Sequence, residues 1–263
     1  MTPAILKYPR TYHIEGSRLQ SGDEGMGNIP IAAIAGRHIV VAEKVDGGNA
    51  AISFGPDGTL LLQSRGHYLT GGPRERHFAL FKRWAAAHTT TLWDAIGDRY
   101  VVYGEWLYAK HTLFYDALPH YFMEFDVRDR TTGAFLDTAR RRLLLQGLPI
   151  VPVRVLLDGS VRALGELTRL VGPSAFITPD HLERLATICV ARGIDAATAL
   201  RETDPSMTME GLYIKVEEGG VVVDRYKYVR PSFRVTTLDS GGHWLDRPII
   251  PNRLAPGIDL FAP

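Results

Sequence analysis

The chain has 263 residues, of which 45% are hydrophobic and 22% charged, and a formal net charge of +1 at pH 7. These values are typical of a globular protein with a sizeable core, and they exclude a uniformly basic nucleic-acid-binding domain, so any phosphate-binding surface must be local. The single cysteine, Cys189, excludes an internal disulfide and a cysteine-rich metal site. We expect a cytoplasmic protein with no signal peptide and no membrane contact.

The first part of the chain predicts an entry segment followed by a hairpin and a helix. Residues 7–28 are rich in Gly, Ser and charge and have no clean period, which is typical of loops. Apolar runs at 38–43, 50–54 and 60–64 predict strands, the last two joined by a Pro-Asp-Gly turn in which proline presets φ and glycine accepts a positive φ. Apolar spacing predicts an amphipathic helix over 74–88.

The middle of the chain predicts two strands and then a helical stretch. Strands are expected over 100–105 and 120–127, and the pattern from about 138 to 205 is mainly helical. Within that stretch Thr178 precedes a proline and is expected to cap a helix whose apolar face includes Cys189. Cys189 is therefore expected in the core.

The last part predicts a strand pair and an extended tail. Apolar runs at 211–216 and 221–228 flank a Gly-Gly turn. The proline-containing segment from about 239 to 263 predicts an extended tail rather than a second domain. We therefore expect one α+β domain over residues 1–263, built on antiparallel sheet with a helical insertion at about 138–205.

One lysine lies where an apolar strand meets a glycine pair. Lys44 is part of Glu43-Lys44-Val45-Asp46-Gly47-Gly48-Asn49, so a strand would support its amine beside a turn with room for phosphate. A lysine nucleophile needs a lowered pKa, which burial or neighbouring cations provide. We therefore expect basic residues to converge on Lys44.

Further polar motifs follow, each at or near the end of a predicted strand. Strand alternation places Arg225 and Lys227 on one face, so both cations are expected to point at the same site. The further motifs are Ser64-Arg65-Gly66, Tyr103-Gly104-Glu105-Trp106, the segment 121–127, and the segment 210–215 with Arg225-Tyr226-Lys227.

The order and spacing of these motifs resemble the covalent nucleotidyltransferase superfamily of ATP-dependent ligases and messenger-RNA capping enzymes, whose first motif is KxDG. Asn49, the Phe-Asp-Val at 125–127 and the Glu-Gly-Leu-Tyr-Ile-Lys at 210–215 are similar to the RNA ligase 2 branch. The resemblance spans about 40–230 and implies a nucleotidyltransferase domain, an ATP-grasp-like ligase adenylation domain. The short stretch after Arg230 leaves no room for the C-terminal OB-fold of DNA ligases.

The resemblance also implies a role for each motif residue. Lys44 would be the nucleophile that carries AMP, and Glu210 would bind the metal, Mg²⁺ or Mn²⁺. Lys215 and Lys227 would contact the α-phosphate of ATP. Arg225 would be a further catalytic cation, and it stands where the family usually has lysine. The remaining nucleotide contacts would be Glu43, Asp46, Gly47, Asn49, Arg65, Glu105 and Phe125.

Two groups of residues keep alternative interpretations. Phe122, on the opposite face of its strand from Phe125, could take the place of Phe125 on the adenine. In the entry segment, a phosphate or RNA contact and a solvated loop are equally consistent with the polar, basic residues, which are Arg10, His13, Ser17 and Arg18.

Two histidines, His111 and His120, flank a predicted loop and are not spaced as zinc ligands usually are. Both are expected to be loop residues or residues of an RNA-binding surface.

The resemblance implies an ATP-dependent RNA ligase. Lys44 would take AMP from ATP and pass it to an RNA 5′-phosphate, which a 3′-hydroxyl then attacks; RNA repair, with a partner protein in place of a second domain, is the implied biology. One alternative is an ATP-dependent DNA ligase, against which the missing OB-fold argues. Another is a non-catalytic nucleic-acid end-binding protein, against which the joint presence of Lys44, Glu105, Glu210 and Lys227 argues.

Overall fold

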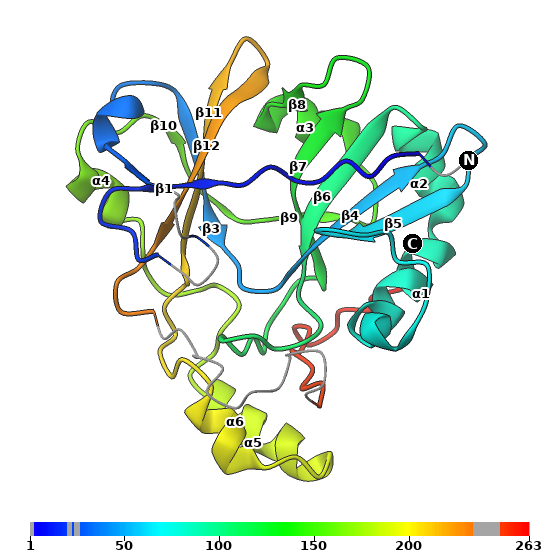
Figure 1. Ribbon diagram of the computed structural model, residues 1–263. Coiled ribbons are helices and arrows are strands. Elements are labelled where there is room, and N and C mark those ends of the chain that lie inside the picture. Colours follow the sequence, from blue (N-terminus) through cyan, green and yellow to red (C-terminus); the bar gives the residue numbers. More distant parts are fainter. Residues whose placement is uncertain (1–2, 20–22, 24–26, 234–247, 263) are drawn as a thin grey trace.

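A computed structural model describes residues 3–19, 23, 27–233 and 248–262. Within these residues the strands form one twelve-stranded, mostly antiparallel sheet whose path is β10-β3-β11-β12-β8-β7-β6-β4-β5. The sheet is folded into two halves that face each other across the middle of the molecule (Figure 1). The short strand β8 (Phe135–Leu136) pairs with a strand of each half and so joins them.

The first half of the sheet is built around β3 (Ile39–Lys44), whose apolar run is buried. Buried side chains on both faces explain why this strand reads as a continuous apolar run rather than as an alternation. Its partners are β10 (Val155–Gly159) and β11 (Gly211–Glu218), and β11 also pairs with β12 (Val221–Val229).

The entry segment adds short strands to this half. β1 (Tyr12–Ile14) runs parallel to β12, and β2 (Asn28–Ile29) runs parallel to β1, followed by a 3-10 turn, η1 (Ile31–Ala33). This part of the chain is therefore an edge of the sheet as well as a loop.

The second half of the sheet contains the predicted hairpin and the two strands that follow it. β4 (Gly48–Phe54) and β5 (Leu60–Ser64) form the hairpin, and β6 (Tyr100–Trp106) and β7 (Phe122–Asp129) continue the sheet from β4.

Two helices cover the outer face of this half (Figure 1). The predicted helix begins as a 3-10 turn, η2 (Pro73–Phe78), continues as α1 (Ala79–Ala87), and is followed by α2 (Thr89–Ile96). Phe81 and Trp84 of α1 are fully buried against the sheet, which accounts for the apolar periodicity of the segment.

The predicted helical insertion at about 138–205 needs correction. It contains α3 (Thr138–Leu144), α4 (Leu164–Thr168), α5 (His181–Ala191) and α6 (Ala196–Arg201), but also β10 and the short strand β9 (Val151–Pro152). β10 pairs with β3, so this part of the segment belongs to the sheet. The helical pattern on both sides concealed a strand of only five residues.

The start of α5 also differs from the prediction. The helix begins at His181 after Asp180, whereas Thr178 donates its hydroxyl to Asp116 Oδ2 at 2.5 Å and thereby ties the segment to the loop before β7. Cys189 is fully buried, as predicted, in a small cluster with Leu185 of the same helix.

The described part of the tail, residues 248–262, packs against the loop between β6 and β7. Residues 239–247 of the predicted tail lie outside the described residues. Asn252 is buried, and its side chain donates to Leu107 O at 2.7 Å and accepts from Tyr115 N at 2.9 Å. Among the described helices the longest has 11 residues, and none could cross a bilayer.

Candidate active site

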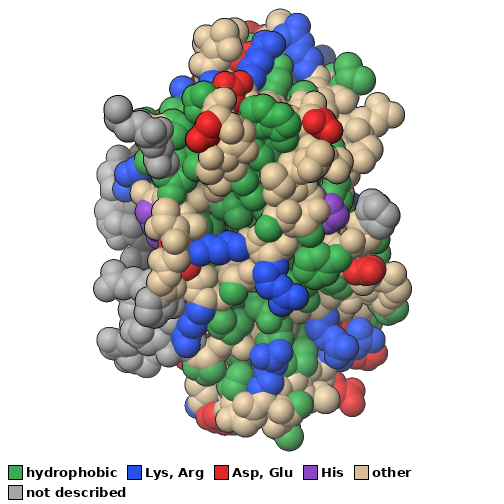
Figure 2. Space-filling model, turned by 90° about the vertical axis from the view of Figure 1, so that its right-hand side faces the viewer, with side chains coloured by type: hydrophobic (Ala, Val, Ile, Leu, Met, Phe, Trp, Pro, Cys, Tyr) green, Lys and Arg blue, Asp and Glu red, His purple; other side chains and the backbone are tan. Residues whose placement is uncertain are grey.

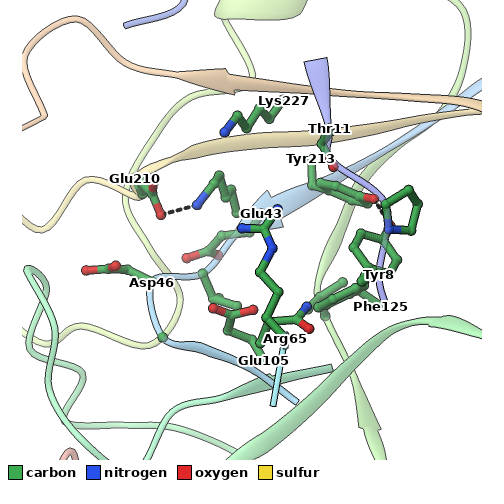
Figure 3. Close-up of a pocket in the computed structure, with 16 residues that line it drawn as sticks. Tyr8, Thr11, Glu43, Asp46, Arg65, Glu105, Phe125, Glu210, Tyr213 and Lys227 are labelled. Carbon is green, nitrogen blue, oxygen red and sulfur yellow. Dashed lines mark hydrogen bonds and ion pairs between the residues drawn. The ribbon is translucent and has the colours of Figure 1, made fainter. Parts of the chain in front are cut away.

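A pocket of about 330 Å³ lies between the two halves of the sheet. In Figure 3 the aromatic side chains Tyr8, Tyr213 and Phe125 lie on one side of it and Glu210 and Asp46 on the other. Its lining residues are Tyr8, Pro9, Thr11, Glu43, Lys44, Val45, Asp46, Gly47, Asn49, Arg65, Glu105, Phe125, Val153, Glu210, Tyr213 and Lys227. Most of the predicted site residues therefore meet in one cavity.

Lys44 is the last residue of β3 and lies opposite Gly211 in the register with β11. Its Nζ is 2.6 Å from Oε2 of the buried carboxylate of Glu210. The turn after Lys44 requires glycine, because a Cβ at Gly47 would lie 2.7 Å from Trp106 O. Strand and turn together present the amine to the pocket.

The predicted lowering of the Lys44 pKa is wrong. Burial lowers the pKa of Lys44, but the carboxylates of Glu210, Glu105 and Asp46 raise it by more, so the net shift is upward. The prediction failed because it counted the cations in the motifs and not the carboxylates, and the carboxylates are what surround the amine.

Glu105 lies opposite Asn49 in the pairing of β6 with β4. Burial raises the pKa of Glu105 to about 8; Lys44 opposes this shift, and the negative charges of Glu210 and Asp46 add to it. Asn49 Oδ1 is buried and has no hydrogen-bond partner among the described residues, so it is an acceptor available to a ligand.

Asp46 and Glu43 line the pocket and also hold neighbouring segments. Asp46 Oδ2 accepts from the backbone N–H groups of Thr112 and Leu113, at 2.7 and 2.9 Å. Glu43 Oε1 accepts from Ser174 Oγ at 2.5 Å, and burial raises the pKa of Glu43. The strand that carries Lys44 is thus anchored on both sides of this lysine.

The structure separates the two phenylalanines between which the sequence left a choice. Phe125 lines the pocket, and its ring centroid is 5.8 Å from that of Tyr213 and 5.1 Å from that of Tyr8. Phe122 is fully buried behind the sheet and stacks on Phe81 of α1. Of these two phenylalanines, only Phe125 is placed to contact a ligand in the pocket.

The predicted convergence of Lys215, Arg225 and Lys227 on one site is only partly correct. Lys227 lines the pocket, but Lys215 and Arg225 do not. Lys215 is buried and donates to Phe125 O at 2.8 Å and to Asp126 Oδ1 at 3.3 Å.

Arg225 lies behind the aromatic side of the pocket. Its Nε is 3.7 Å from Asp126 Oδ2, and its guanidinium lies 4.0 Å from the centroid of the Phe135 ring. The prediction that Arg225 and Lys227 lie on the same face of β12 is correct. Neighbouring side chains, however, cover the part of that face that carries Arg225.

In the entry segment the structure distinguishes buried from exposed residues. His13 and Ser17 are buried, whereas Arg10 and Arg18 are exposed and do not line the pocket. Arg18 donates to the backbone oxygen of Phe233 at 2.6 Å, so it holds the chain after β12.

Three pocket or pocket-contacting residues of the entry segment were missed from the sequence. Tyr8 and Thr11 line the pocket, and Asp23 Oδ2 is 2.8 Å from the Nζ of Lys227. Their local sequence is that of a loop, so only the parallel pairing of β1 with β12 brings them to the site.

The two histidines lie in the loop between β6 and β7, as predicted, but neither is a fully exposed surface residue. His120 is buried, its ring centroid lies 4.9 Å from that of Trp84, and burial lowers its pKa to about 4. His111 is half-buried at the edge of the pocket, with Nδ1 4.0 Å from Asp46 Oδ1.

The carboxylates around Lys44 fit a divalent cation by donor chemistry and charge. Glu210 and Glu105 supply oxygen donors of the kind that Mg²⁺ and Mn²⁺ prefer. Burial raises the pKa of Glu105, the negative charges of Glu210 and Asp46 add to that shift, and a cation would offset their contribution. In the part of the chain that the structure describes, no group of three or more His, Cys, Asp or Glu residues is arranged as a ready metal site.

Comparisons with known proteins give a family and a fold. A family model described as RNA ligase matches residues 37–229. A search of the curated proteins gives no match.

Among solved structures, a mutant Naegleria gruberi RNA ligase with AMP and Mn is similar with a TM-score of 0.52 and 15% identity, over 87% of this chain and 57% of that chain. An archaeal ATP-dependent RNA ligase is similar with a TM-score of 0.50 and 18% identity, over 86% of this chain and 48% of that chain. At such low identity these likenesses show the fold, and this chain spans about half the length of the solved structures that it matches.

Proposed function

Because the chain belongs to the RNA ligase family, we propose that it is an ATP-dependent RNA ligase that works through a lysyl-AMP intermediate on Lys44. The observation that carries the proposal is the position of Lys44, which ends a buried strand in a pocket whose opposite side is aromatic. A pocket that binds a nucleotide needs aromatic side chains for the base and cations for the phosphates. This pocket supplies both, with the amine of Lys44 and a second lysine, Lys227.

The proposed reaction has three steps. The Nζ of Lys44 forms a bond to the α-phosphorus of ATP while the bond to pyrophosphate breaks, and the amine loses a proton. An oxygen of an RNA 5′-phosphate then displaces the lysine, and AMP is joined to the RNA end. Finally a 3′-hydroxyl attacks the 5′-phosphate, closes the phosphodiester bond and releases AMP.

The protein's own side chains would position the substrate and move the proton. Glu210 Oε2, 2.6 Å from Nζ, is placed to accept the proton that Lys44 must lose. Phe125 and Tyr213 would hold the adenine, Asn49 and Arg65 would bind ribose or phosphate, and Lys227 would stabilise charge on the α-phosphate.

A divalent cation fits the same carboxylates, and we propose that Glu210 holds it, with Glu105 nearby. When bound, Mg²⁺ or Mn²⁺ supplies positive charge that neutralises the triphosphate and offsets the negative charge that raises the Lys44 pKa.

RNA would bind along the surface of the domain. On the face that turns toward the right-hand side of Figure 1, Lys and Arg side chains are scattered from top to bottom, with Asp and Glu side chains among them (Figure 2). Separated cations of this kind contact the phosphates of the backbone without reading sequence. An RNA-repair role with a partner protein and a cytoplasmic location are parts of the same proposal and rest on the resemblance and the composition.

Label transfer from ATP tests the first step. The protein is incubated with ATP labelled on the α-phosphate and a divalent metal and is then run on a denaturing gel; we expect an acid-labile label on the wild type and none on Lys44→Ala. ATP labelled on the γ-phosphate should leave no label, and Lys82→Ala, outside the pocket, should label normally. A wild type without label, or a labelled Lys44→Ala, would refute the proposal.

Sealing assays test the substrate. Matched nicked duplexes with an RNA or a DNA strand carrying the 5′-phosphate and 3′-hydroxyl should be sealed in the RNA case, and a 5′-hydroxyl RNA should not be sealed. Faster sealing of the DNA nick would move the assignment to a DNA ligase, and label without sealing of either would move it to an adenylyltransferase that acts on a different acceptor.

A further inference from the structure

Lys227 is held by a series of hydrogen bonds that starts in the entry segment. Its Nζ is 2.8 Å from Asp23 Oδ2, and the same oxygen is 2.8 Å from His13 Nε2. His13 Nδ1 is 2.6 Å from Ser17 Oγ, which accepts from Val229 N at 2.9 Å. The series therefore runs from the backbone of β12 through the entry segment and back to a side chain of β12.

Strand pairing and burial make this arrangement specific. β1 is parallel to β12 with His13 opposite Lys227, so both side chains lie on the same face of the sheet. The side chain of His13 is 0% exposed, and those of Asp23 and Lys227 are each 14% exposed. Hydrogen bonds this sheltered from water hold a side chain in place better than exposed ion pairs do.

The hydrogen-bond pattern also selects one tautomer of His13. Because Ser17 Oγ accepts from Val229 N–H, its own hydrogen is available to donate to His13 Nδ1, and Nε2–H then donates to Asp23. The opposite tautomer would turn an unprotonated Nε2 toward a carboxylate oxygen. Burial lowers the pKa of His13, which favours the neutral ring that this pattern requires.

We infer that Asp23 is a positioning residue that holds Lys227 in the pocket, and that His13 and Ser17 hold Asp23. The inference rests on the proposed function, in which Lys227 stabilises charge on the α-phosphate. It extends the site to three residues that lie before the part of the chain matched by the family model, residues 37–229.

The charges around Lys227 explain why it needs a positioning residue. Burial lowers the pKa of Lys227, and the nearby ammonium of Lys44 lowers it further. The Asp23 carboxylate raises it, as does Glu210, and His13 is neutral. Asp23 thus keeps a cation close to another cation, in the place where phosphate would bind.

An inhibitory role for the contact between Asp23 and Lys227 gives the opposite expectation. If Asp23 competed with phosphate for Lys227, removal of its charge would free the lysine and favour the reaction. The two interpretations therefore differ in the sign of the effect on the rate and on the ATP requirement.

Single-turnover formation of lysyl-AMP over a range of ATP concentrations separates them. For Asp23→Asn we expect the maximal rate to fall about tenfold or more, with the half-saturating ATP concentration changed by less than about threefold, because a misplaced group costs rate more than binding. A rate that is unchanged, or that rises, would overturn the inference, as would a fall of more than about threefold in the half-saturating ATP concentration.

A second His–Asp pair in the chain provides the matched control. His38 Nε2 is 2.8 Å from Asp158 Oδ1, the same distance as in the His13–Asp23 contact, but both side chains are about half exposed and lie outside the pocket. Asp158→Asn should leave the rate and the half-saturating ATP concentration unchanged, and melting curves of both variants check that they are folded.

The tautomer of His13 gives a readout that does not depend on catalysis. Two-bond nitrogen–proton correlation spectra of the ¹⁵N-labelled protein should show His13 protonated at Nε2 alone. A wild type that forms no lysyl-AMP would refute the proposed function, and the spectra would still decide the arrangement; an Nδ1-protonated or doubly protonated His13 at neutral pH would overturn the inference.

Discussion

The charged residues on the two sides of Phe125 are arranged in opposite ways. In the pocket, the ammonium of Lys44 faces the carboxylates of Glu210, Glu105 and Asp46, which raise its pKa. Burial raises the pKa of Glu105 to about 8, and the negative charges of Glu210 and Asp46 add to that shift.

Behind Phe125 each buried carboxylate has at least one cationic partner. Glu124 is 2.6 Å from the guanidinium of Arg141, and both side chains are buried. Asp126 meets Lys215 at 3.3 Å and Arg225 at 3.7 Å. We call these five residues the Asp126 network.

This difference between the two sides of Phe125 indicates two roles among the motif residues, one in stability and one in the reaction. A buried carboxylate that already has a cationic partner leaves little for a ligand to change, and removal of that partner leaves the carboxylate with an uncompensated burial cost. In the pocket, the carboxylates around Lys44 outnumber its single ammonium. This arrangement is costly in the free protein and favours the binding of a divalent cation together with the phosphates that the cation carries. We therefore expect changes in the Asp126 network to act on stability and changes in the pocket to act on the reaction.

Arg141→Ala should have the largest effect. It leaves the buried carboxylate of Glu124 without its partner and should lower the free energy of unfolding by about 3–5 kcal/mol, a fall in melting temperature of roughly 10 °C. Arg142→Ala, exposed on the same helix, is the control and should change the melting temperature little. A shift of similar size in both variants would show that the buried pair has no special role.

Lys227→Ala should affect the reaction and not the fold. Loss of one cation at the α-phosphate should slow lysyl-AMP formation about 100-fold, or about 2.7 kcal/mol, with the melting temperature almost unchanged. Lys227→Arg, which keeps the charge, should recover part of the rate. A normal rate in Lys227→Ala would place the α-phosphate elsewhere in the pocket.

Arg225→Ala should show the reverse pattern, two residues away on the same strand. Lys215 and Tyr8 still bond to Asp126, so the loss of stability should be only about 1–2 kcal/mol, measured by denaturant unfolding. Lysyl-AMP formation per folded molecule should fall far less than in Lys227→Ala. A loss of rate as large as that of Lys227→Ala, without loss of stability, would show that Arg225 acts directly in the reaction.

Glu105→Gln should have the smallest effect, and it appears in the pH dependence of stability. The pKa of Glu105 is about 8 in the folded protein and close to 4.5 in the unfolded chain, so between these values the folded state binds more protons and loses stability as pH rises.

The Gln variant removes that contribution, so its melting temperature should fall less than that of the wild type between about pH 5 and pH 8. Glu183→Gln, exposed on α5, should follow the wild-type profile. Parallel profiles for Glu105→Gln and wild type would show that Glu105 is ionised in the free protein.

Much of the fold could be predicted from the sequence because its signals are local. The apolar runs and glycine-containing turns located β3, β4, β5, β11 and β12 to within a few residues. The short strand β10 was missed, because five residues between helical stretches carry no period of their own, and its pairing with β3 is made over more than a hundred residues of chain.

The candidate site divides in the same way. The sequence by itself determined that Lys44 ends a strand beside glycines and that the motif residues follow in ligase order, since residue type and spacing are enough for both. Only the tertiary structure decided that Lys44 faces carboxylates, that Lys227 and not Arg225 reaches the pocket, and that Asp23 holds Lys227. These facts depend on which segments meet across the folded sheet, and no local pattern records that.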